Sequence, residues 1–291
     1  MQIVADAHGQ RFAQFHAMAS PCVVMVDGAD DPELARLGEI AARQAHRVEQ
    51  KWSRYLKDNV VHRINTANGG PVAVDDETAR MLDFATLAWR ESNGLFDITS
   101  GVLRRAWRFD GSDRVPDRAA VASLLPLVGW SKVTWLSPQL KMLPGMEIDF
   151  GGIGKEYAVD LALRDVAAAT DKPVLINFGG DLAASAPCRD GEGWRVGIDS
   201  GASRATPLVR LRKGAVTTSG DARRYLLKDG VRYSHVLDPR SGWPVANAPR
   251  AVTVAAATCS EAGVLSTLAM LRGAEAESFL AKRGVDHHVV R

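Results

Sequence analysis

The chain has 291 residues, in which 36 Lys and Arg are balanced by 34 Asp and Glu, giving a formal net charge of +2. This balance lacks the basic excess of a surface that tracks phosphates, so we do not expect nucleic acid as a partner. Hydrophobic residues make up 46% and charged residues 24%, which is typical of a globular protein and excludes disordered and collagen-like chains.

The three cysteines, Cys22, Cys188 and Cys259, lie far apart, without the CxxC spacing of zinc sites or redox motifs. We interpret them as structural thiols. No stretch reaches the roughly 20 apolar residues of a membrane helix, and the first residues lack a charged segment followed by an apolar core. We therefore expect a soluble protein without a membrane span, cytoplasmic as given, or periplasmic if an export signal was trimmed.

The first half of the chain is predicted to contain helices, strands and a long connection. Apolar residues at three- and four-residue steps predict the helices, and short apolar runs predict the strands. In chain order we expect a strand at 15–26, helices at 32–56 and 77–92, and, within the proline-containing stretch 103–145, a short helix near 117–125 and a strand near 132–136. The helix at 77–92 has Asp75 or Asp76 as its N-cap candidate and Gly94 as its stop.

The second half is predicted to be richer in strands and to begin with two glycine-rich turns. The turn at 151–154 is expected to follow a strand and lead into a helix, and the turn at 179–180 is expected to follow another strand. The other expected elements are strands at 194–199, 207–213, 222–227, 231–237, 250–257 and 285–290 and helices at 260–271 and 274–283. Asp229 and Gly230 indicate a hairpin turn.

Strands and helices are mixed along the chain, and consecutive hairpins dominate its second half. This pattern favours an α+β fold, with mixed sheets and packed helices, over a doubly wound parallel sheet. We expect a single domain over 1–291, and the length also allows two lobes, at about 1–145 and 146–291. The two glycine-rich turns are expected to frame the cleft.

The first glycine-rich turn has the composition of an anion-binding loop. Gly151, Gly152 and Gly154 carry no side chains, which exposes backbone N–H groups at the positive end of the following helix. Lys155 adds a positive charge there. The turn matches neither the Walker loop nor the dinucleotide fingerprint, which fails at Tyr157. The alternative is a plain tight turn.

Three further segments combine turn residues with reactive side chains. Asn177 to Asp181 places two glycines and an acid after an apolar strand, with a solvated turn as the alternative. Residues 217–221 read Thr-Thr-Ser-Gly-Asp. His235 precedes Asp238 by three residues, and a neutral imidazole accepts a hydroxyl proton near neutral pH. The alternative is a structural histidine bonded to Asp238.

The order of these turns resembles the ApbE family of FAD:protein FMN transferases. The matching motifs are AMAS at 17–20, WSRYLKDNVVHRIN at 52–65, SNGLFDITSGVL at 92–103, DFGGIGKEYAVD at 149–160, INFGGD at 176–181, TSGD at 218–221 and YSHVLDPRSGWPV at 233–245. The resemblance implies the flavin-binding, T-fold-like architecture of that family. It also implies an enzyme that attaches FMN from FAD, through a phosphoester, to a Thr or Ser of an acceptor flavoprotein and releases AMP.

The resemblance also implies which residues contact the substrate. Those expected to line the FAD pocket are Met18, Tyr55, Phe96, Asp97, Ile98, Asp149, Lys155, His235 and Leu237. Among them, His235 is expected to be catalytic, because the resemblance places it beside the reacting phosphate instead of at the adenine end.

The Mg²⁺ site implied by the resemblance departs from the family pattern. The carbonyl of Gly152 and the hydroxyl of Thr267 correspond to two family ligands, whereas the position of the family's carboxylate is Gly263. A hard cation prefers anionic oxygens, so we expect weak metal binding that Gly263→Asp would strengthen. Asp181, or a phosphate oxygen of FAD, is the candidate to complete the site. Glu156 stands where the family usually has glycine.

The missing carboxylate leaves two alternatives open. One is a flavin-binding protein that holds FAD without efficient transfer, as a carrier, reservoir or regulatory subunit. The other is a nucleotide hydrolase, which would need a preserved metal site and a carboxylate that activates water. Asp181 and Asp221 are the candidates for that carboxylate.

Overall fold

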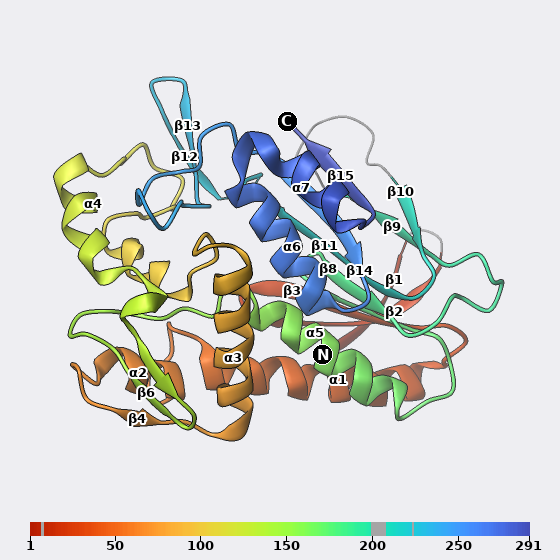
Figure 1. Ribbon diagram of the computed structural model, residues 1–291. Helices are drawn as coiled ribbons and strands as arrows, with labels where there is room; N and C mark the ends of the chain where they lie inside the picture. Colours follow the sequence, from red (N-terminus) through yellow and green to blue (C-terminus); the bar gives the residue numbers. More distant parts are fainter. Residues whose placement is uncertain (7–8, 199–207, 223) are drawn as a thin grey trace.

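The computed structural model describes residues 1–6, 9–198, 208–222 and 224–291. Within them, the centre of the fold is an eight-stranded antiparallel sheet with the strand order β1-β2-β3-β7-β8-β11-β14-β15 (Figure 1). Its strands are β1 (Gln2–Ala5), β2 (Arg11–Ala17), β3 (Ser20–Val26), β7 (Val174–Phe178), β8 (Asp181–Ala184), β11 (Gly214–Gly220), β14 (Ala251–Ala256) and β15 (His287–Val290). Three smaller sheets pair β9 (Trp194–Gly197) with β10 (Leu208–Leu211), β12 (Tyr225–Lys228) with β13 (Val231–Ser234), and β6 (Gln139–Lys141) with β4 (Val72–Ala73) and β5 (Thr134–Leu136).

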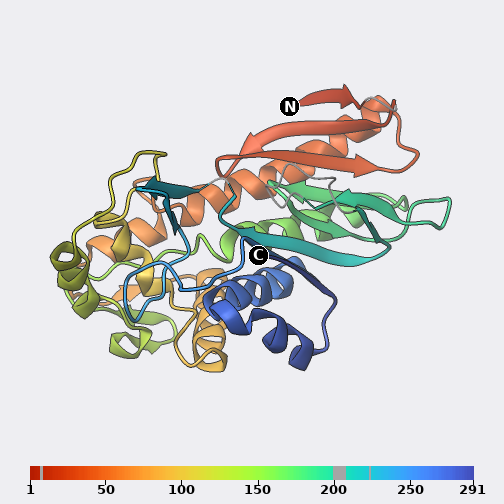
Figure 2. The same ribbon diagram turned by 90° about the horizontal axis from the view of Figure 1, so that it is seen from above.

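Three long helices cover one face of the large sheet (Figures 1 and 2). The helices are α1 (Asp31–Trp52), α5 (Gly154–Ala167) and α6 (Cys259–Leu271), which contact the strands, and α5 also contacts both α1 and α6. The other helices are α2 (Val60–Thr66), α3 (Asp76–Glu91), α4 (Arg118–Leu124), α7 (Ala276–Arg283) and the 3₁₀ helices η1 (Ile98–Arg105), η2 (Leu125–Leu127), η3 (Trp130–Lys132) and η4 (Gly273–Glu275).

The alternation of side chains along β7 gives the sheet two apolar faces. Ile176 and Phe178 belong to the main core, beneath the helices. Leu175 belongs to a second cluster, on the opposite face, together with Trp194 and Val196 of β9. The main core contains buried residues from both halves of the chain, and the lobe boundary near residue 145 stays a prediction.

The predicted α+β fold is confirmed. The expected helices correspond to α1, α3, α4, α6 and α7 within a few residues, and Asp75 is the N-cap of α3. The predicted helix at 32–56 ends early, because Ser53 already has extended backbone angles. The short elements β1, α2, η1, β4 and β6 were not predicted, and neither were the central strands β8 and β11. The interpretation of residues 217–221 as a turn is wrong, because residues 217–220 belong to β11. Residues 199, 207 and 223, which belong to expected strands, lie outside the described residues.

Residues 15–26 form the hairpin of β2 and β3, so the prediction of one strand there is wrong. Met18 and Ala19 make the turn, with φ of 53° and 54°. Two-residue hairpin loops require this left-handed conformation and usually contain Asn-Gly or Asp-Gly. Because neither pair is present, residues 15–26 contain no turn signal, and Met18 lies at the hairpin tip instead of within a strand.

The strand expected before the first glycine-rich turn is also wrong, because residues 142–150 form no strand. The side chain of Asn65 donates to the Ile148 carbonyl at 3.0 Å and accepts from the Ile148 N–H at 2.8 Å. The Asp149 N–H donates to the carbonyl of Ile98 at 2.9 Å. A side chain and a 3₁₀ helix therefore bind the backbone groups that a neighbouring strand would have paired.

Within the described residues, no helix combines the length and the apolar character needed to cross a membrane.

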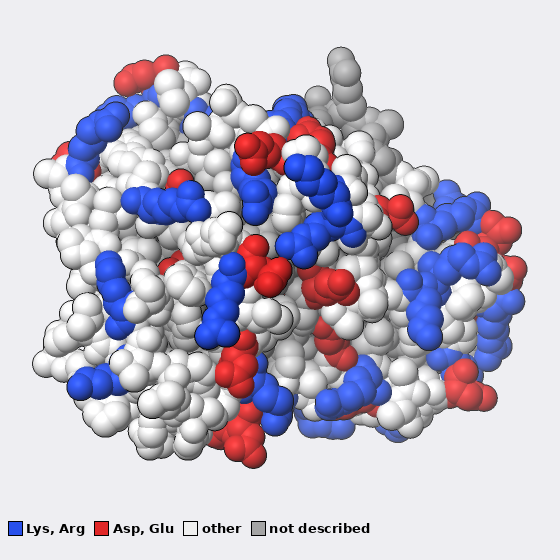
Figure 3. Space-filling view, viewed as in Figure 1, with Lys and Arg blue, Asp and Glu red and all other residues white. Residues whose placement is uncertain are grey.

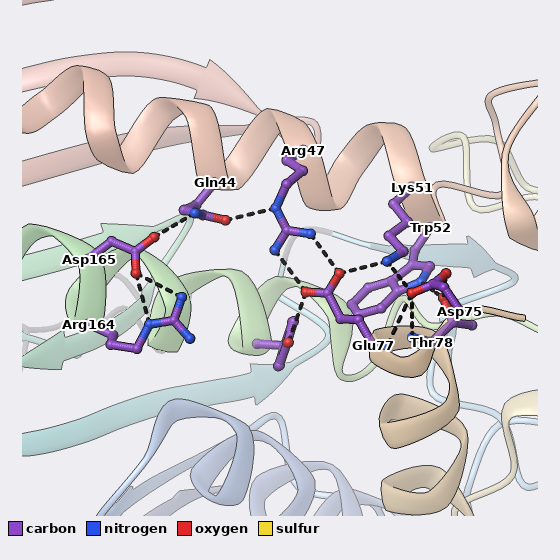
Figure 4. Close-up of polar contacts among 10 residues, drawn as sticks. Gln44, Arg47, Lys51, Trp52, Asp75, Glu77, Thr78, Arg164 and Asp165 are labelled. Atoms are coloured by element: carbon purple, nitrogen blue, oxygen red, sulfur yellow. Dashed lines mark hydrogen bonds and ion pairs between the residues drawn. The ribbon is translucent and has the colours of Figure 1, made fainter. Parts of the chain in front are cut away.

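A polar network around Glu77 joins α1, α3 and α5 (Figure 4). Arg47 donates two hydrogen bonds to the Glu77 carboxylate, at 2.6 and 2.8 Å, and Lys51 adds a third at 2.7 Å. The hydroxyl of Tyr157 on α5 donates at 3.0 Å. The bonds from Arg47, followed by those from Lys51 and Tyr157, outweigh burial and lower the pKa of Glu77 to about 2.

Replacing Glu77 with glutamine is expected to lower the free energy of unfolding by about 1–3 kcal/mol at pH 7, because charge-assisted hydrogen bonds are lost. A pKa lowered from 4.5 means that the native state binds fewer protons, so this contribution exists above pH 4.5 and disappears as the pH falls toward 2. Denaturant unfolding at several pH values, with exposed Glu39→Gln as control, tests this. A difference between wild type and Glu77→Gln that is independent of pH contradicts it.

Candidate functional site

The first glycine-rich turn leads directly into α5. The Phe150 carbonyl accepts hydrogen bonds from the N–H groups of Ile153 and Gly154, at 3.0 and 2.7 Å. The Asp149 carboxylate accepts from the Gly151 N–H at 2.9 Å. No side chain of the described residues caps the start of α5. The remaining N–H groups of its first turn are thus suited to an anion.

Arg54 connects two of the predicted FAD residues. Its guanidinium forms an ion pair with Asp149 at 2.7 Å and donates to the hydroxyl of Tyr55 at 3.0 Å. It also lies over the Tyr55 ring, 5.0 Å from the centroid. Tyr55 is 72% exposed, so its ring is open to a planar aromatic ligand.

The Asp97 carboxylate is buried and engaged within the protein. One oxygen accepts from the Thr99 N–H and hydroxyl, at 2.8 and 2.6 Å, and the other accepts from the Trp130 N–H at 2.8 Å. Burial nevertheless raises the pKa of Asp97 above its ordinary value. This carboxylate therefore fixes the start of η1, and its predicted contact with FAD stays a prediction.

Phe96 and Ile98 flank Asp97 and contact the glycine-rich turn. A Cβ at Gly152 would lie 3.7 Å from the Phe96 ring, and the Ile98 carbonyl binds the Asp149 N–H as described above. Both side chains are buried. These two buried side chains therefore belong to the part of the core next to the turn.

The tip of the β2–β3 hairpin meets the second glycine-rich turn and Lys155. Met18, at the tip, packs against the main core. The Gly179 N–H donates to the Pro21 carbonyl at 2.9 Å. Gly179 has a φ of 63°, and a Cβ there would lie 2.6 Å from the Ser20 hydroxyl and 3.5 Å from the Lys155 ammonium. The Lys155 side chain, from the start of α5, thus reaches the second glycine-rich turn, and the cleft expected between the two turns stays a prediction.

Lys155 shares its charge between two buried carboxyl groups. Its ammonium lies 2.6 Å from Asp181, whose side chain is 6% exposed. Burial, and then the charge of Asp181, raises the pKa of Glu156 to about 8, while Lys155 lowers it. Asp181 has the ammonium as its direct partner, whereas no described residue forms an ion pair with Glu156.

His235 lies after β13, where its ring contacts the backbone of Arg224. Its Nδ1 is 2.9 Å from the Arg224 carbonyl. A carbonyl only accepts, so Nδ1 carries the proton and Nε2 keeps the lone pair. Burial, and then the Arg224 charge, lowers the pKa of His235 below its ordinary value. The expected alternative partner is wrong, because Asp238 accepts from the Arg240 N–H instead.

The charge of Arg224 also acts on Tyr55. Partial burial raises the pKa of Tyr55, but hydrogen bonding and charge from Arg54, with a smaller contribution from the charge of Arg224, lower it by more. Arg224 thus acts electrostatically on both predicted residues, Tyr55 and His235. Leu237 packs in a separate apolar cluster with Trp107.

Thr267 belongs to a group of hydroxyl side chains between β11 and α6. Its hydroxyl lies 3.1 Å from that of Ser219, which in turn lies 2.7 Å from that of Ser266. The Ser266 hydroxyl donates to the Gly263 carbonyl at 3.0 Å. Thr217 is 3.3 Å from Ser266. The structure thus surrounds the predicted metal residue Thr267 with further oxygen atoms.

The environment of Gly263 changes the outcome expected for Gly263→Asp. A Cβ at this position would lie 2.6 Å from Cγ and 3.1 Å from Cδ of Glu156, closer than van der Waals contact. The substitution alone therefore crowds Glu156 and is not a simple gain of a metal ligand.

Several residues of the site were not identified from the sequence. Arg54 lies within the motif at 52–65. A cation directly before Tyr55 in the sequence was the signal that could have identified Arg54 as a residue of the site. Arg224 and Ser266 carry no motif, and their roles come from contacts between distant segments. Over the face shown in Figure 3, positive and negative side chains are interspersed.

Residues 18–289 match the model of the ApbE family. A protein of Vibrio cholerae named FAD:protein FMN transferase is 29% identical over 241 residues, covering 80% of this chain and 72% of the relative. The Escherichia coli K12 protein of the same name is 27% identical, covering 89% and 77%.

Solved structures show the same fold. The ApbE protein of Thermotoga maritima superposes with a TM-score of 0.86 at 28% identity, covering 99% of this chain and 94% of that one. The flavinyl transferase ApbE of Pseudomonas stutzeri, in its apo form, gives a TM-score of 0.84 at 28% identity, covering 100% and 92%. The match therefore includes all the segments that form the candidate site.

Proposed function

Because the chain belongs to the ApbE family, we propose that it is an FAD:protein FMN transferase, acting on a Thr or Ser hydroxyl of an acceptor flavoprotein. The hydroxyl oxygen bonds to the FMN phosphorus, the bond from that phosphorus to the bridging oxygen breaks, and AMP leaves with that oxygen. The observation that carries this proposal is the approach of the Lys155 ammonium, at the uncapped start of α5, to the second glycine-rich turn.

Lys155 and the N–H groups of α5 would bind the pyrophosphate. Positioning and charge neutralisation are the main requirements of phosphoryl-type transfer. Arg54 holds Asp149 and leaves the Tyr55 ring exposed, which suits the planar flavin. These groups, suited to a pyrophosphate and to a planar ring, support FAD as the proposed substrate.

His235 is the proposed base. Its Nδ1–H is bound by the Arg224 carbonyl, so its Nε2 is the atom that would accept the hydroxyl proton. The lowered pKa keeps the imidazole neutral at pH 7.

A Mg²⁺ ion would be held by the Gly152 carbonyl and the Thr267 hydroxyl. These hard oxygen donors fit that cation, and a carboxylate oxygen of Glu156 in the same region accepts no hydrogen bond from the described residues. When bound, the ion supplies charge neutralisation at the pyrophosphate.

The hydrolase alternative is disfavoured by ion pairs. Asp181 is paired with Lys155 at 2.6 Å, and Asp221 with Arg232 and Arg250 at 2.9 and 3.4 Å. Neither carboxylate is poised to activate water. The flavin-binding alternative rests on the absence of a side chain at Gly263.

A direct assay distinguishes transfer from binding alone. We expect the purified protein, incubated with FAD, Mg²⁺ and a peptide bearing an acceptor Thr, to add the mass of FMN to the peptide. A peptide with the acceptor Thr replaced by Val is the control. Binding of FAD by calorimetry without any mass increase would support the flavin-binding alternative.

A further inference from the structure

Glu156 is an acidic side chain buried between two helices with one oxygen unsatisfied. The residue is 8% exposed, and its Oε2 accepts no hydrogen bond from any described residue. A buried oxygen of this kind loses its hydration without compensation, so it usually marks a catalytic group or the place of a bound water or ion.

Gly263 provides the space for this carboxyl group. A Cβ at Gly263 would lie 2.6 Å from Cγ and 3.1 Å from Oε1 of Glu156. The Glu156 side chain therefore lies over the position where a side chain from α6 would project. Thr267 follows Gly263 by four residues on α6 and so lies on the same face of the helix.

The two helices are held in register next to this contact. Asp160, one turn after Glu156 on α5, accepts hydrogen bonds from the N–H groups of Cys259 and Ser260, at 2.7 and 2.9 Å. These bonds fix the start of α6 against α5. The approach of Glu156 to Gly263 is thus part of the helix packing.

Further hard oxygen donors belong to α6, to β11 against which it packs, and to the turn before α5. Thr267 and Ser219 place hydroxyl groups 3.1 Å apart beside α6. The exposed Gly152 lies in the turn before α5, four residues before Glu156. Asp181 is already paired with Lys155 at 2.6 Å.

Resting on the proposed function, we propose that Glu156 supplies the anionic ligand of the Mg²⁺ site. It does so from α5, in the space that a carboxylate at position 263 would occupy from α6. Gly263 and Glu156 then represent an exchange of the carboxylate between helices: the glycine on α6 leaves the space that the Glu156 side chain from α5 fills. The site keeps a carboxylate and does not depend on Asp181.

Metal binding measured without turnover tests this proposal. Mn²⁺ is the probe, and its free signal in electron paramagnetic resonance is titrated with protein, with and without FAD. Glu156→Gln keeps the shape of the side chain and removes its charge. We expect it to weaken Mn²⁺ binding by about 10–100-fold or more, the range by which even groups behind the ligands affect metal affinity. Glu261→Gln, exposed on α6, is the control and should bind Mn²⁺ like wild type.

The exchange itself is tested with two further variants. Gly263→Asp alone should not improve Mn²⁺ binding, because its side chain collides with Glu156. Glu156→Ala/Gly263→Asp moves the carboxylate to α6 and should recover affinity to within about tenfold of wild type. Circular dichroism confirms that each variant is folded.

The proposal is overturned if Glu156→Gln binds Mn²⁺ like wild type, or if wild type does not bind Mn²⁺; Glu156 is then a neutral core acid. Failure of the proposed function looks different. In that case Glu156→Gln loses Mn²⁺ binding as expected, while wild type transfers no FMN to the acceptor peptide.

Discussion

Replacing His235 with alanine is expected to slow FMN transfer by about 10²–10⁴-fold, the usual contribution of a general base. The affinity for FAD should change little, because the proposed role of His235 is to take a proton from the acceptor hydroxyl. Its Nδ1–H is bound to the Arg224 carbonyl at 2.9 Å, which leaves Nε2 as the basic atom. Single-turnover transfer and calorimetric FAD binding separate the two effects.

The pH profile provides the second readout for His235. The neutral imidazole is the active form, so the wild-type rate should rise with pH through a pKa below the ordinary 6.5 and then level off. This acidic limb should be absent in His235→Ala. His288→Ala, on the exposed edge strand β15, is the control. Equal rates, or a loss of stability with the limb unchanged, would show that His235 has only a structural role.

Replacing Lys155 with methionine is expected to lower the free energy of unfolding by about 3–5 kcal/mol at neutral pH, because it leaves buried carboxyl groups without their cation. Asp181, 2.6 Å from the ammonium, is the direct partner, and Glu156 lies beside it. Without Lys155, the carboxyl pKa values rise further above their unfolded values. The native state then binds more protons than the unfolded state, so the deficit should grow as the pH rises.

Two controls isolate the ion pair. Lys228→Met, on the exposed β12–β13 hairpin, should leave stability unchanged. The double variant Lys155→Met/Asp181→Leu should recover part of the loss, since an apolar pair avoids the buried charge. A double variant as unstable as Lys155→Met would mean that the lysine acts through packing alone.

The same variant tests the contact with substrate. At a temperature where Lys155→Met is folded, its affinity for FAD should fall by about 1–3 kcal/mol, the value of a charge-assisted contact with phosphate. Calorimetry on the folded variant measures this. An unchanged affinity would assign Lys155 to the Asp181 pair only.

Features that depend on neighbouring residues were predictable from the sequence. Asp75 caps α3 as expected, because a carboxylate before a helix binds its first N–H groups within one turn. The glycines before α5 have no side chains to cover the N–H groups of its first turn, and this does not depend on what the helix packs against. The motifs around these turns were sufficient to indicate the family, which the match over residues 18–289 confirms.

Features that depend on distant segments were decided only by the tertiary structure. The Asn65 side chain takes the place of a strand beside Ile148, and Arg54 pairs with Asp149. The sequence shows a glycine at 263 and an acid at 156 as two separate departures from a family pattern. Only the packing of α5 on α6 makes them neighbours, because close approach of two helices is set by the shape of both faces and not by either sequence alone.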